Sequence, residues 1–409
     1  MNNLYIKSIK SNNHPFVKAE NIDISSTENK KKNIIITGVN GSGKTTILTS
    51  LKNAIATYTQ QKNNYALVQN RRLTEYKNAK TKLSLIDPTE PAYQSALTEL
   101  DAIYSRCINY GAFLNINFSI DDFYDTNYFV LAYFEAKRVT DLSKPQSISA
   151  PTLNHTPIGD HNVGKLFIQH LVNRRSQQSF AFEDGDIDEA DKIRNWFIQL
   201  NALFSEVFGK KVKLIFKRSD LYFVLEDENK ELIDLIKLSD GYSAIISIVC
   251  EIITRMEAIS FGNFDVSGIV LIDEIETHLH VSLQRKILPF LSKMFPNIQF
   301  IVTTHSPFIL SSVDDAIIYD LESGDCIDQE EALWAYSYEA LVDGYFETER
   351  FSVILESKIE EYERLKSIDP DKLSRGERKN LRKLTKELEN VPLYKNESIE
   401  LKLKQLGLR

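Results

Sequence analysis

The sequence has few cysteines, no long apolar run and no excess of positive charge. Its cysteines, Cys107, Cys250 and Cys326, are far apart, odd in number and match no zinc-ligand spacing, so we expect reduced thiols in a cytoplasmic protein. No run of about 18 apolar residues occurs and residues 1–14 hold no apolar signal core, so we expect neither a membrane-spanning helix nor secretion. The net charge of −8 argues against a generally basic nucleic-acid binder, but it leaves room for a local basic groove.

A glycine-rich stretch, Gly38–Thr45, matches the phosphate-loop pattern G-x-x-x-x-G-K-[ST]. Apolar residues predict a strand at 33–37 and a helix at 44–57, the setting that this loop requires. Glycines let backbone N–H groups approach phosphate oxygens, and the helix dipole favours the anion. We predict that Lys44 reaches the β- and γ-phosphates of ATP and that the Thr45 hydroxyl binds Mg²⁺. The predicted nucleotide-binding residues are Gly38, Asn40, Gly41, Ser42, Gly43, Lys44, Thr45 and Thr46.

Two adjacent carboxylates follow a second apolar stretch, "GIVLIDE" at 268–274. Such a stretch suits a central parallel strand that ends at the nucleotide crevice. We predict that Asp273 holds Mg²⁺ and that Glu274 orients or deprotonates the attacking water. A strand that merely ends in a polar turn is the alternative, and it explains one acid better than two.

A histidine follows the next apolar stretch, "NIQFIVTTHSP" at 297–307. His305 lies just past the predicted strand end, on the side of an open α/β sheet where ligands collect. We predict that its neutral ring bonds a γ-phosphate oxygen and helps to position the water, although a purely structural histidine is the alternative.

The pentapeptide "LSDGY" at 238–242 precedes a segment with helical periodicity. Ser239 and Gly241 are predicted at the N-terminal end of this helix, with Ser243 as a candidate cap. A helix N-terminus there is a second phosphate-binding element, and an ordinary cap is the alternative.

Taken in order, the motifs "GVNGSGKT", "LSDGY", "IVLIDE", "IETHLH" and "TTHSP" resemble the ABC-type ATPase heads of the SMC, RecF and OLD group. The resemblance implies an α/β P-loop NTPase fold with a mixed sheet, an antiparallel N-terminal subsheet, helical insertions and a helical C-terminal extension. It also implies two heads packed head to tail, as a dimer or a higher homo-oligomer. Ser239 and Gly241 of one copy then meet the γ-phosphate bound by the other, and "IETHLH" forms the D-loop at that interface.

The chain departs from the family pattern at two places. Tyr242 stands where the family has Gln or Glu, and no convincing Q-loop glutamine is found. Arg138, in "YFEAKR" after a predicted strand, is either a charge-stabilising residue of that loop or an ordinary solvated strand end.

The 409 residues suffice for about two to three domains. Two predicted helices flank "DPTEP" and form an antiparallel hairpin too short for SMC-like arms.

Arg174 and Arg175 are interpreted as an ordinary exposed helix end. The predicted division is 1–57 and 111–140 for the N-terminal ATPase lobe, 58–110 for the hairpin insertion, 141–210 for a linker and helical subdomain, 211–345 for the second ATPase lobe, and 346–409 for a partner-docking extension.

Three acids near the C-terminus, Glu356, Asp369 and Asp371, raise the question of a Toprim nuclease of the OLD type. That fold needs its acids at the ends of separate parallel strands, and each crossover between such strands takes a dozen or more residues. Only twelve residues separate Glu356 from Asp369, and they have a helical apolar stripe. We therefore reject the nuclease.

The segment "YSYEALVDGYF" with its helical tail resembles the ATPases of Septu-type anti-phage systems, including the versions attached to retrons. The resemblance implies an ATP- and Mg²⁺-dependent sensor subunit that restrains a separate HNH nuclease, with a reverse transcriptase and its RNA and DNA in the retron versions. A RecF- or SMC-like head that binds DNA directly in repair is the alternative.

Overall fold

The computed structural model describes residues 4–18, 21–24, 31–60, 64–119, 129–138, 142–156, 163–328, 353–369, 372–390 and 403–405. The chain divides into two compact units, Met1–Ala335 and Tyr336–Arg409. The first unit holds every motif of the predicted nucleotide site. The finer division into lobes stays a prediction.

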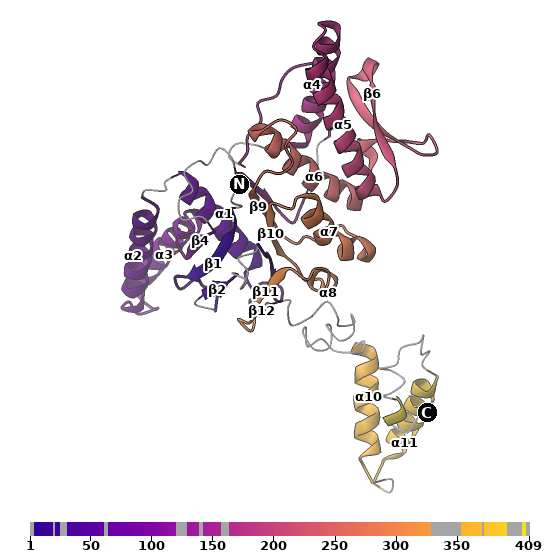
Figure 1. Cartoon of the computed structure of the whole chain (residues 1–409). Helices are drawn as coiled ribbons and strands as arrows, with labels where there is room; N and C mark the ends of the chain where they lie inside the picture. The colour runs from indigo at the N-terminus through magenta and orange to yellow at the C-terminus, as the bar shows by residue number, and fades with distance from the viewer. Residues whose placement is uncertain are drawn as a thin grey trace. The chain divides into compact units, whose positions relative to one another are not determined.

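A six-stranded sheet forms the centre of the first unit (Figure 1). Its order is β12-β11-β3-β10-β9-β5, and all neighbours are parallel except the antiparallel pair β11 and β12. Every residue of β3, β9 and β10 is buried, because helices cover the sheet and leave its central strands no solvent face. The strands span β3 Asn33–Thr37, β5 Val130–Phe134, β9 Gly268–Ile272, β10 Ile298–Thr303, β11 Ala316–Asp320 and β12 Cys326–Asp328. The predicted strand at 33–37 and those before Asp273 and His305 are confirmed.

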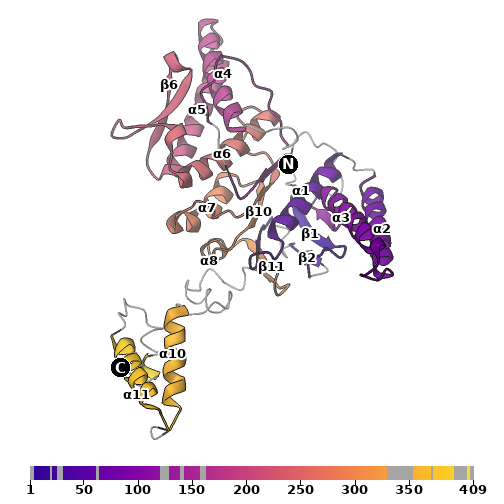
Figure 2. The ribbon, with the colours of Figure 1, turned by 180° about the vertical axis from the view of Figure 1, so that it is seen from behind.

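A smaller antiparallel sheet, ordered β2-β1-β4, confirms the predicted N-terminal subsheet. Helix α1 packs between this sheet and the central one, with contacts to β4, β10 and β9 (Figure 2). Its apolar side, including Ile47, Leu48 and Leu51, is fully buried in the shared core. These elements span β1 Ile6–Ser11, β2 Asn21–Asp23, β4 Leu114–Phe118 and α1 Lys44–Gln60. The phosphate loop is therefore anchored in core on both sides.

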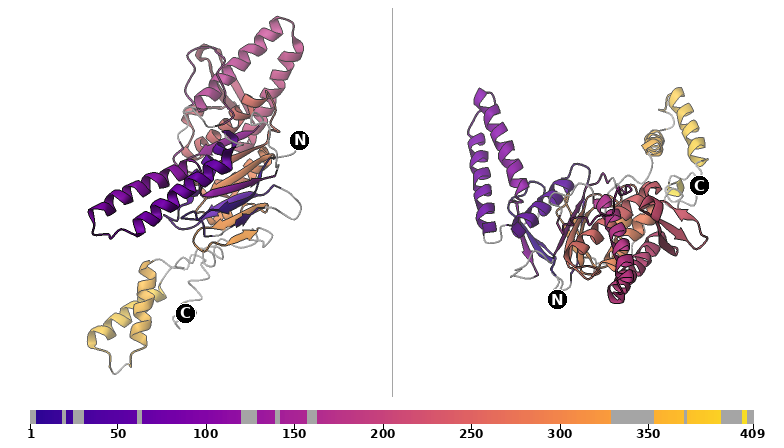
Figure 3. Two further views of the ribbon diagram at one scale, coloured as in Figure 1. Left: turned by 90° about the vertical axis from the view of Figure 1, so that its left-hand side faces the viewer. Right: turned by 90° about the horizontal axis from the view of Figure 1, so that it is seen from above.

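Two long helices, α2 Tyr65–Ser84 and α3 Pro91–Asn109, lie side by side and extend away from the sheets (Figure 3). A small core that includes Leu73, Ile103 and Phe113 joins them to the chain that leads into β4. Pro91 begins α3, where a missing backbone N–H costs no hydrogen bond. The predicted antiparallel helical pair is thus present.

A helical layer and an antiparallel three-stranded sheet, ordered β6-β7-β8, build the other side of the first unit (Figure 1). Helix α5 ends at Gly209, whose φ of 62° suits glycine, and the chain turns directly into β6. Helix α7 begins after the D-loop and leads to β10. These elements span α4 Val163–Glu183, α5 Ile187–Phe208, β6 Val212–Lys217, η3 Arg218–Asp220, β7 Tyr222–Asp227, β8 Leu232–Ile233, η4 Leu235–Lys237, α6 Asp240–Ile259, α7 Val281–Met294 and α8 Pro307–Leu310.

The second unit holds α10 Val353–Lys366 and α11 Arg375–Glu389 around a small core of its own. A reciprocal capping box of Ser374 and Glu377 begins α11. Glu356 lies on α10, not at a strand end. The segment "YSYEALVDGYF" and Asp371 lie outside the described residues. In the part of the chain that the structure describes, no helix is long and apolar enough to cross a membrane.

Candidate nucleotide-binding site

The phosphate loop joins β3 to α1 through three glycines in backbone conformations that other residues rarely adopt. Gly38, Gly41 and Gly43 have φ angles of 138°, 82° and 96°. A Cβ atom added to Gly43 would lie 2.2 Å from the ring of Phe16, so this position admits no side chain. Gly41 has open space around it. The loop geometry therefore depends on backbone freedom at all three positions and on lack of bulk at Gly43.

The Lys44 side chain folds back over the loop. Its Nζ donates to the carbonyl oxygens of Gly38 and Val39 at 2.8 and 2.9 Å, and Ser42 Oγ is 3.5 Å away. Burial lowers the pKa of Lys44, which is 6 % exposed, and the acidic neighbours led by Glu274 and Asp273 oppose that shift. An ammonium has three donors. Two bond the loop carbonyls at short distance, and the third makes only the long 3.5 Å bond to Ser42 Oγ, so it is the one that can turn to a phosphate oxygen.

Thr45 and Asp273 meet at the predicted Mg²⁺ position. The Thr45 hydroxyl donates to Asp273 Oδ2 at 2.7 Å, and the Thr303 hydroxyl donates to Asp273 Oδ1 at 2.6 Å. A hydroxyl from the phosphate loop and a carboxylate at a strand end are the protein ligands that Mg²⁺ takes in P-loop proteins, with phosphates and water completing its shell. The residues present therefore fit the ion, although their role as ligands stays a prediction.

Glu274 follows directly and has a left-handed backbone, with φ of 44°. Its N–H donates to Thr303 Oγ1 at 2.7 Å, and its Oε2 accepts from the Thr277 hydroxyl at 3.2 Å. A residue other than glycine in this conformation costs of order 1–3 kcal/mol, and such strain is concentrated at functional sites. The surroundings thus hold the carboxylate in place at the edge of the crevice, half-buried.

Arg138 contacts the backbone of the residues that follow β9. Its guanidinium donates to the carbonyl oxygens of Glu274 at 2.9 Å and Ile275 at 3.3 Å, and its pKa is lowered by burial. Neither earlier interpretation of Arg138 describes these contacts. The side chain is not a solvated strand end, and it binds the backbone of Glu274 and of the start of the D-loop, residues 275–280, which makes it a positioning residue.

His305 lies just past β10, as predicted. The backbone N–H of His305 donates to Glu276 Oε1 at 2.6 Å, and the Thr304 hydroxyl donates to Glu276 Oε2 at 2.8 Å. Burial, and then the positive charge of Lys44, lower the pKa of His305, so the ring is neutral near pH 7. Among the described residues, no group forms a hydrogen bond with this ring, so it can bond a ligand.

The signature segment lies at the N-terminus of α6, but the helix begins earlier than expected. Ser239 is the N-cap, Asp240 is the first helical residue, and both are exposed. Ser243, predicted as a candidate cap, lies within the first turn, where its N–H donates to the Ser239 carbonyl at 2.8 Å. The candidate cap was therefore wrong. The Ser239 side chain forms no capping bond, which leaves its hydroxyl available.

Two contacts tie this segment to its own chain. A Cβ atom on Gly241 would lie 3.2 Å from the His278 carbonyl of the D-loop. Tyr242, the departure from the family pattern, stacks its ring on Phe208 at 5.0 Å between centroids and 16° between planes. The tyrosine is therefore explained by packing on the end of α5.

The structure brings Lys44, Asp273, Glu274 and His305 into one electrostatic neighbourhood, since each of the acids acts on the pKa of both bases. Asn40, Gly41, Ser42 and Thr46 lie on or beside the loop, as their sequence positions require. Sequence reasoning missed Phe16, Thr303 and Glu276. Thr303 and Glu276 each follow or end a recognised strand, so their positions offered a signal, whereas nothing in the sequence pointed to Phe16.

A family model described as "AAA domain, putative AbiEii toxin, Type IV TA system" matches residues 164–311. That segment holds the signature, the Asp273–Glu274 pair and His305. The model covers less than half of the chain, so it marks a resemblance of this part.

Curated relatives support the resemblance to Septu and retron ATPases that the sequence suggested. "Retron Ec83 probable ATPase" from Escherichia coli is 41 % identical over 104 residues, 25 % of this chain and 19 % of the relative. "Septu protein PtuA" from Bacillus mycoides (strain KBAB4) is 43 % identical over 96 residues, 24 % of this chain and 13 % of the relative. "Retron Vc95 probable ATPase" from Vibrio cholerae is 43 % identical over 89 residues, 21 % of this chain and 17 % of the relative. The matches thus span less than a fifth of these relatives.

Among solved structures, an Smc head bound to the C-winged helix domain of ScpA is 16 % identical, with a TM-score of 0.39. It covers 81 % of this chain and 99 % of that one.

Proposed function

We propose that the chain is an ABC-type head that binds ATP with Mg²⁺ and hydrolyses it. The observation that carries this proposal is the hydrogen bond from Thr45 to Asp273, which joins the phosphate loop to the end of β9 and places Glu274 beside it. In this arrangement Lys44 and the loop amides bind the phosphates, and the Mg²⁺ ion supplies charge neutralisation between them. Glu274 orients the attacking water, and the neutral His305 ring donates its N–H to a γ-phosphate oxygen.

The head acts as a head-to-tail dimer or a higher homo-oligomer in this proposal. Ser239 and Asp240 are exposed, and the Ser239 hydroxyl forms no capping bond within its own helix. A helix N-terminus with open donors is suited to a phosphate. Ser239 and Gly241 therefore serve the nucleotide of a neighbouring copy, and D-loop residues such as His278, which contact Gly241, lie at the same interface.

The experiment for hydrolysis and assembly is Glu274→Gln in the full chain. We expect ATP to bind as in the wild type, hydrolysis to fall about 10²- to 10⁴-fold because the general base is lost, and ATP to trap a larger assembly in light scattering after size-exclusion chromatography. Lys44→Ala is the control, and it should lose both binding and assembly. Hydrolysis at the wild-type rate by Glu274→Gln would contradict the assignment.

The biological role follows from the resemblance to Septu and retron ATPases. We infer a sensor or regulatory subunit of a bacterial anti-phage complex, whose nucleotide state controls a separate nuclease of the HNH type, in retron systems together with a reverse transcriptase and its nucleic acid. The second unit, with its own core around α10 and α11, is the proposed docking element.

Co-purification tests this role directly. The full chain, purified from its own host, should retain a separate HNH-type nuclease, whereas a chain that ends at Ala335 should lose the nuclease and still bind ATP. Retention of the nuclease by the shortened chain would refute docking through the second unit. A nuclease within this chain is not proposed, because Glu356 lies on a helix and the described residues contain no metal-binding cluster of three or more His, Cys, Asp or Glu.

A further inference from the structure

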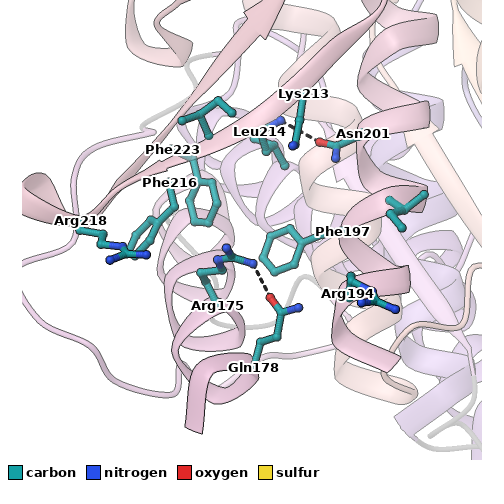
Figure 4. A pocket seen from close by; sticks show the side chains of 12 residues that line it. Arg175, Gln178, Arg194, Phe197, Asn201, Lys213, Leu214, Phe216, Arg218 and Phe223 are labelled. Carbon is teal, nitrogen blue, oxygen red and sulfur yellow. Dashed lines mark hydrogen bonds between the residues drawn. The ribbon is translucent and has the colours of Figure 1, made fainter. Parts of the chain in front are cut away.

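A cavity of about 490 Å³ lies between α4, α5 and the β6–β7 hairpin, away from the elements that form the nucleotide site (Figure 4). Its volume is within the range of about 300–1,000 Å³ that is usual for small-ligand sites. Residues of α4, α5, β6, η3 and β7 contribute to its wall, so it is part of the fold and not a gap beside one loop. Neither the ATPase motifs nor the proposed docking unit accounts for it.

Four cationic side chains surround the cavity, one each from α4, α5, β6 and η3. They are Arg175, Arg194, Lys213 and Arg218, and all are exposed. None of the 12 described residues that line the cavity is acidic. In a chain with a net charge of −8, this is a local reversal of sign. Such a cluster attracts a polyanion.

The nearby carboxylates leave most of this charge uncompensated. Arg194 pairs with Asp191 at 3.1 Å, but both side chains are largely exposed, and such pairs are weak. Glu226 is the register partner of Lys213 across the hairpin, and its carboxylate pairs with Lys230 at 3.0 Å. Arg175 donates to the uncharged Gln178, as Figure 4 shows. Among the described residues, no carboxylate forms an ion pair with Arg175, Lys213 or Arg218.

Three phenylalanine rings share the apolar part of the wall with Ile198, Leu214 and Ile215. Phe197 and Phe223 are stacked at 5.7 Å and 24°, and Phe216 lies against Phe223 at 5.0 Å and 33°. Phe223 is 1 % exposed and anchors the group in the core, whereas Phe216 is half-buried and lines the cavity (Figure 4). A half-exposed ring on a rigid base is a stacking platform for a flat ligand.

We propose that this basic–aromatic cavity binds single-stranded nucleic acid, with one base stacked on the phenylalanine group and the backbone phosphates on the four cations. The combination of aromatic platforms with a positive groove is how proteins hold single strands without reading sequence. An acidic peptide would pair with the cations but has no flat group to stack on the rings. In a duplex the bases are already stacked on each other, so the rings would remain empty.

The test uses the full chain and fluorescence anisotropy with labelled oligothymidylate and oligouridylate of about twelve nucleotides, within the usual site sizes. We expect salt-sensitive binding, with a slope of log K against log salt of up to about −2.8 for four neutralised phosphates. The double variant Arg175→Gln with Arg218→Gln should lower the size of the slope by about 1.4. Phe216→Leu should weaken binding about 5- to 150-fold, since it removes the stacking ring and keeps an apolar side chain.

The control is Arg71→Gln, which removes one positive charge from α2, where the side chain is 76 % exposed. It should leave oligonucleotide binding unchanged. Absence of binding, equal loss in the control, or no effect of Phe216→Leu would each overturn the proposal. Equal affinity for a duplex would overturn the stacking role, and full competition by AMP at the oligonucleotide's own affinity would show that the occupant is a free nucleotide.

This inference does not depend on the proposed ATPase function. Lys44→Ala should lose ATP and keep the oligonucleotide, whereas the Arg175 and Arg218 double variant should keep ATP and lose the oligonucleotide. Failure of one activity is therefore distinguishable from failure of the other.

Discussion

Replacement of Gly43 by alanine tests the geometry of the phosphate loop most directly. At a φ of 96°, an alanine costs about 1–2 kcal/mol in backbone strain alone. The new Cβ atom would also lie 2.2, 2.6 and 2.7 Å from three atoms of Phe16, so the ring must move, and overpacking of this kind costs about 1–3 kcal/mol. The expected total is about 2–5 kcal/mol.

Gly41 supplies the matched control. Its φ is 82°, but an added Cβ atom meets nothing within 4 Å, so Gly41→Ala carries the backbone strain without the clash. The two variants should differ by about 1–3 kcal/mol, the cost of the clash with Phe16. If the loop distorts to relieve this clash, the affinity for ATP should differ by about 5- to 150-fold.

The assay is titration with a fluorescent ATP analogue, together with thermal unfolding of each variant. Phe16→Ala combined with Gly43→Ala should regain most of the ATP affinity that Gly43→Ala loses through the clash. A double-mutant cycle corrects for the effect of Phe16→Ala alone. The reasoning fails if Gly43→Ala binds ATP as tightly as Gly41→Ala. It also fails if removal of the ring restores nothing.

Two further variants address the catalytic carboxylates and the pH dependence of stability. Thr303→Val removes the hydroxyl that bonds both Asp273 Oδ1 and the Glu274 N–H, so we expect a lower kcat and a higher Mg²⁺ requirement, and an unaltered Mg²⁺ titration would contradict this. The variant should also lose about 1–3 kcal/mol of stability, because it leaves buried polar groups without their partner. Burial lowers the pKa of His14 from 6.5 to about 4, so the His14 ring takes up a proton more readily in the unfolded chain than in the folded one. The stabilisation of about 3 kcal/mol is therefore present above pH 6.5 and lost as the pH falls from 6.5 to about 4. His14→Asn should flatten the decline of melting temperature over that interval, whereas the exposed His280→Asn should not, and equal slopes in all three proteins would refute the assignment.

The central sheet and the residues at its strand ends were predictable, because each depends on a local pattern. Four or five consecutive apolar residues specify a strand that is buried on both faces, and the polar residue after it falls at the ligand edge of a parallel sheet. Asp273, Glu274 and His305 follow from this rule alone. The start of α6 was misplaced because Ser239 and Ser243 are both good caps, and only the backbone bond between them shows which one ends the loop.

Contacts between distant segments were not predictable in this way. Phe16 meets Gly43 and Arg138 meets the Glu274 carbonyl through the tertiary packing of the first unit, and neither pair leaves a periodic trace in the sequence. The basic cavity is another case. Arg174 and Arg175 were interpreted together as an exposed helix end, yet Arg174 lies 3.8 Å from the centroid of the Phe261 ring and Arg175 faces the cavity, since neighbours on a helix point in different directions.

Helix α5 contributes residues to both proposed ligand sites. Its middle supplies Arg194 and Phe197 to the basic cavity, and its last residue, Phe208, stacks on Tyr242 at the signature. A helix in a packed layer moves as a body, because close-packed interiors transmit strain. A strand bound in the cavity and a phosphate bound at Ser239 would therefore act on the same element, and any difference in α5 between the two states couples them in both directions.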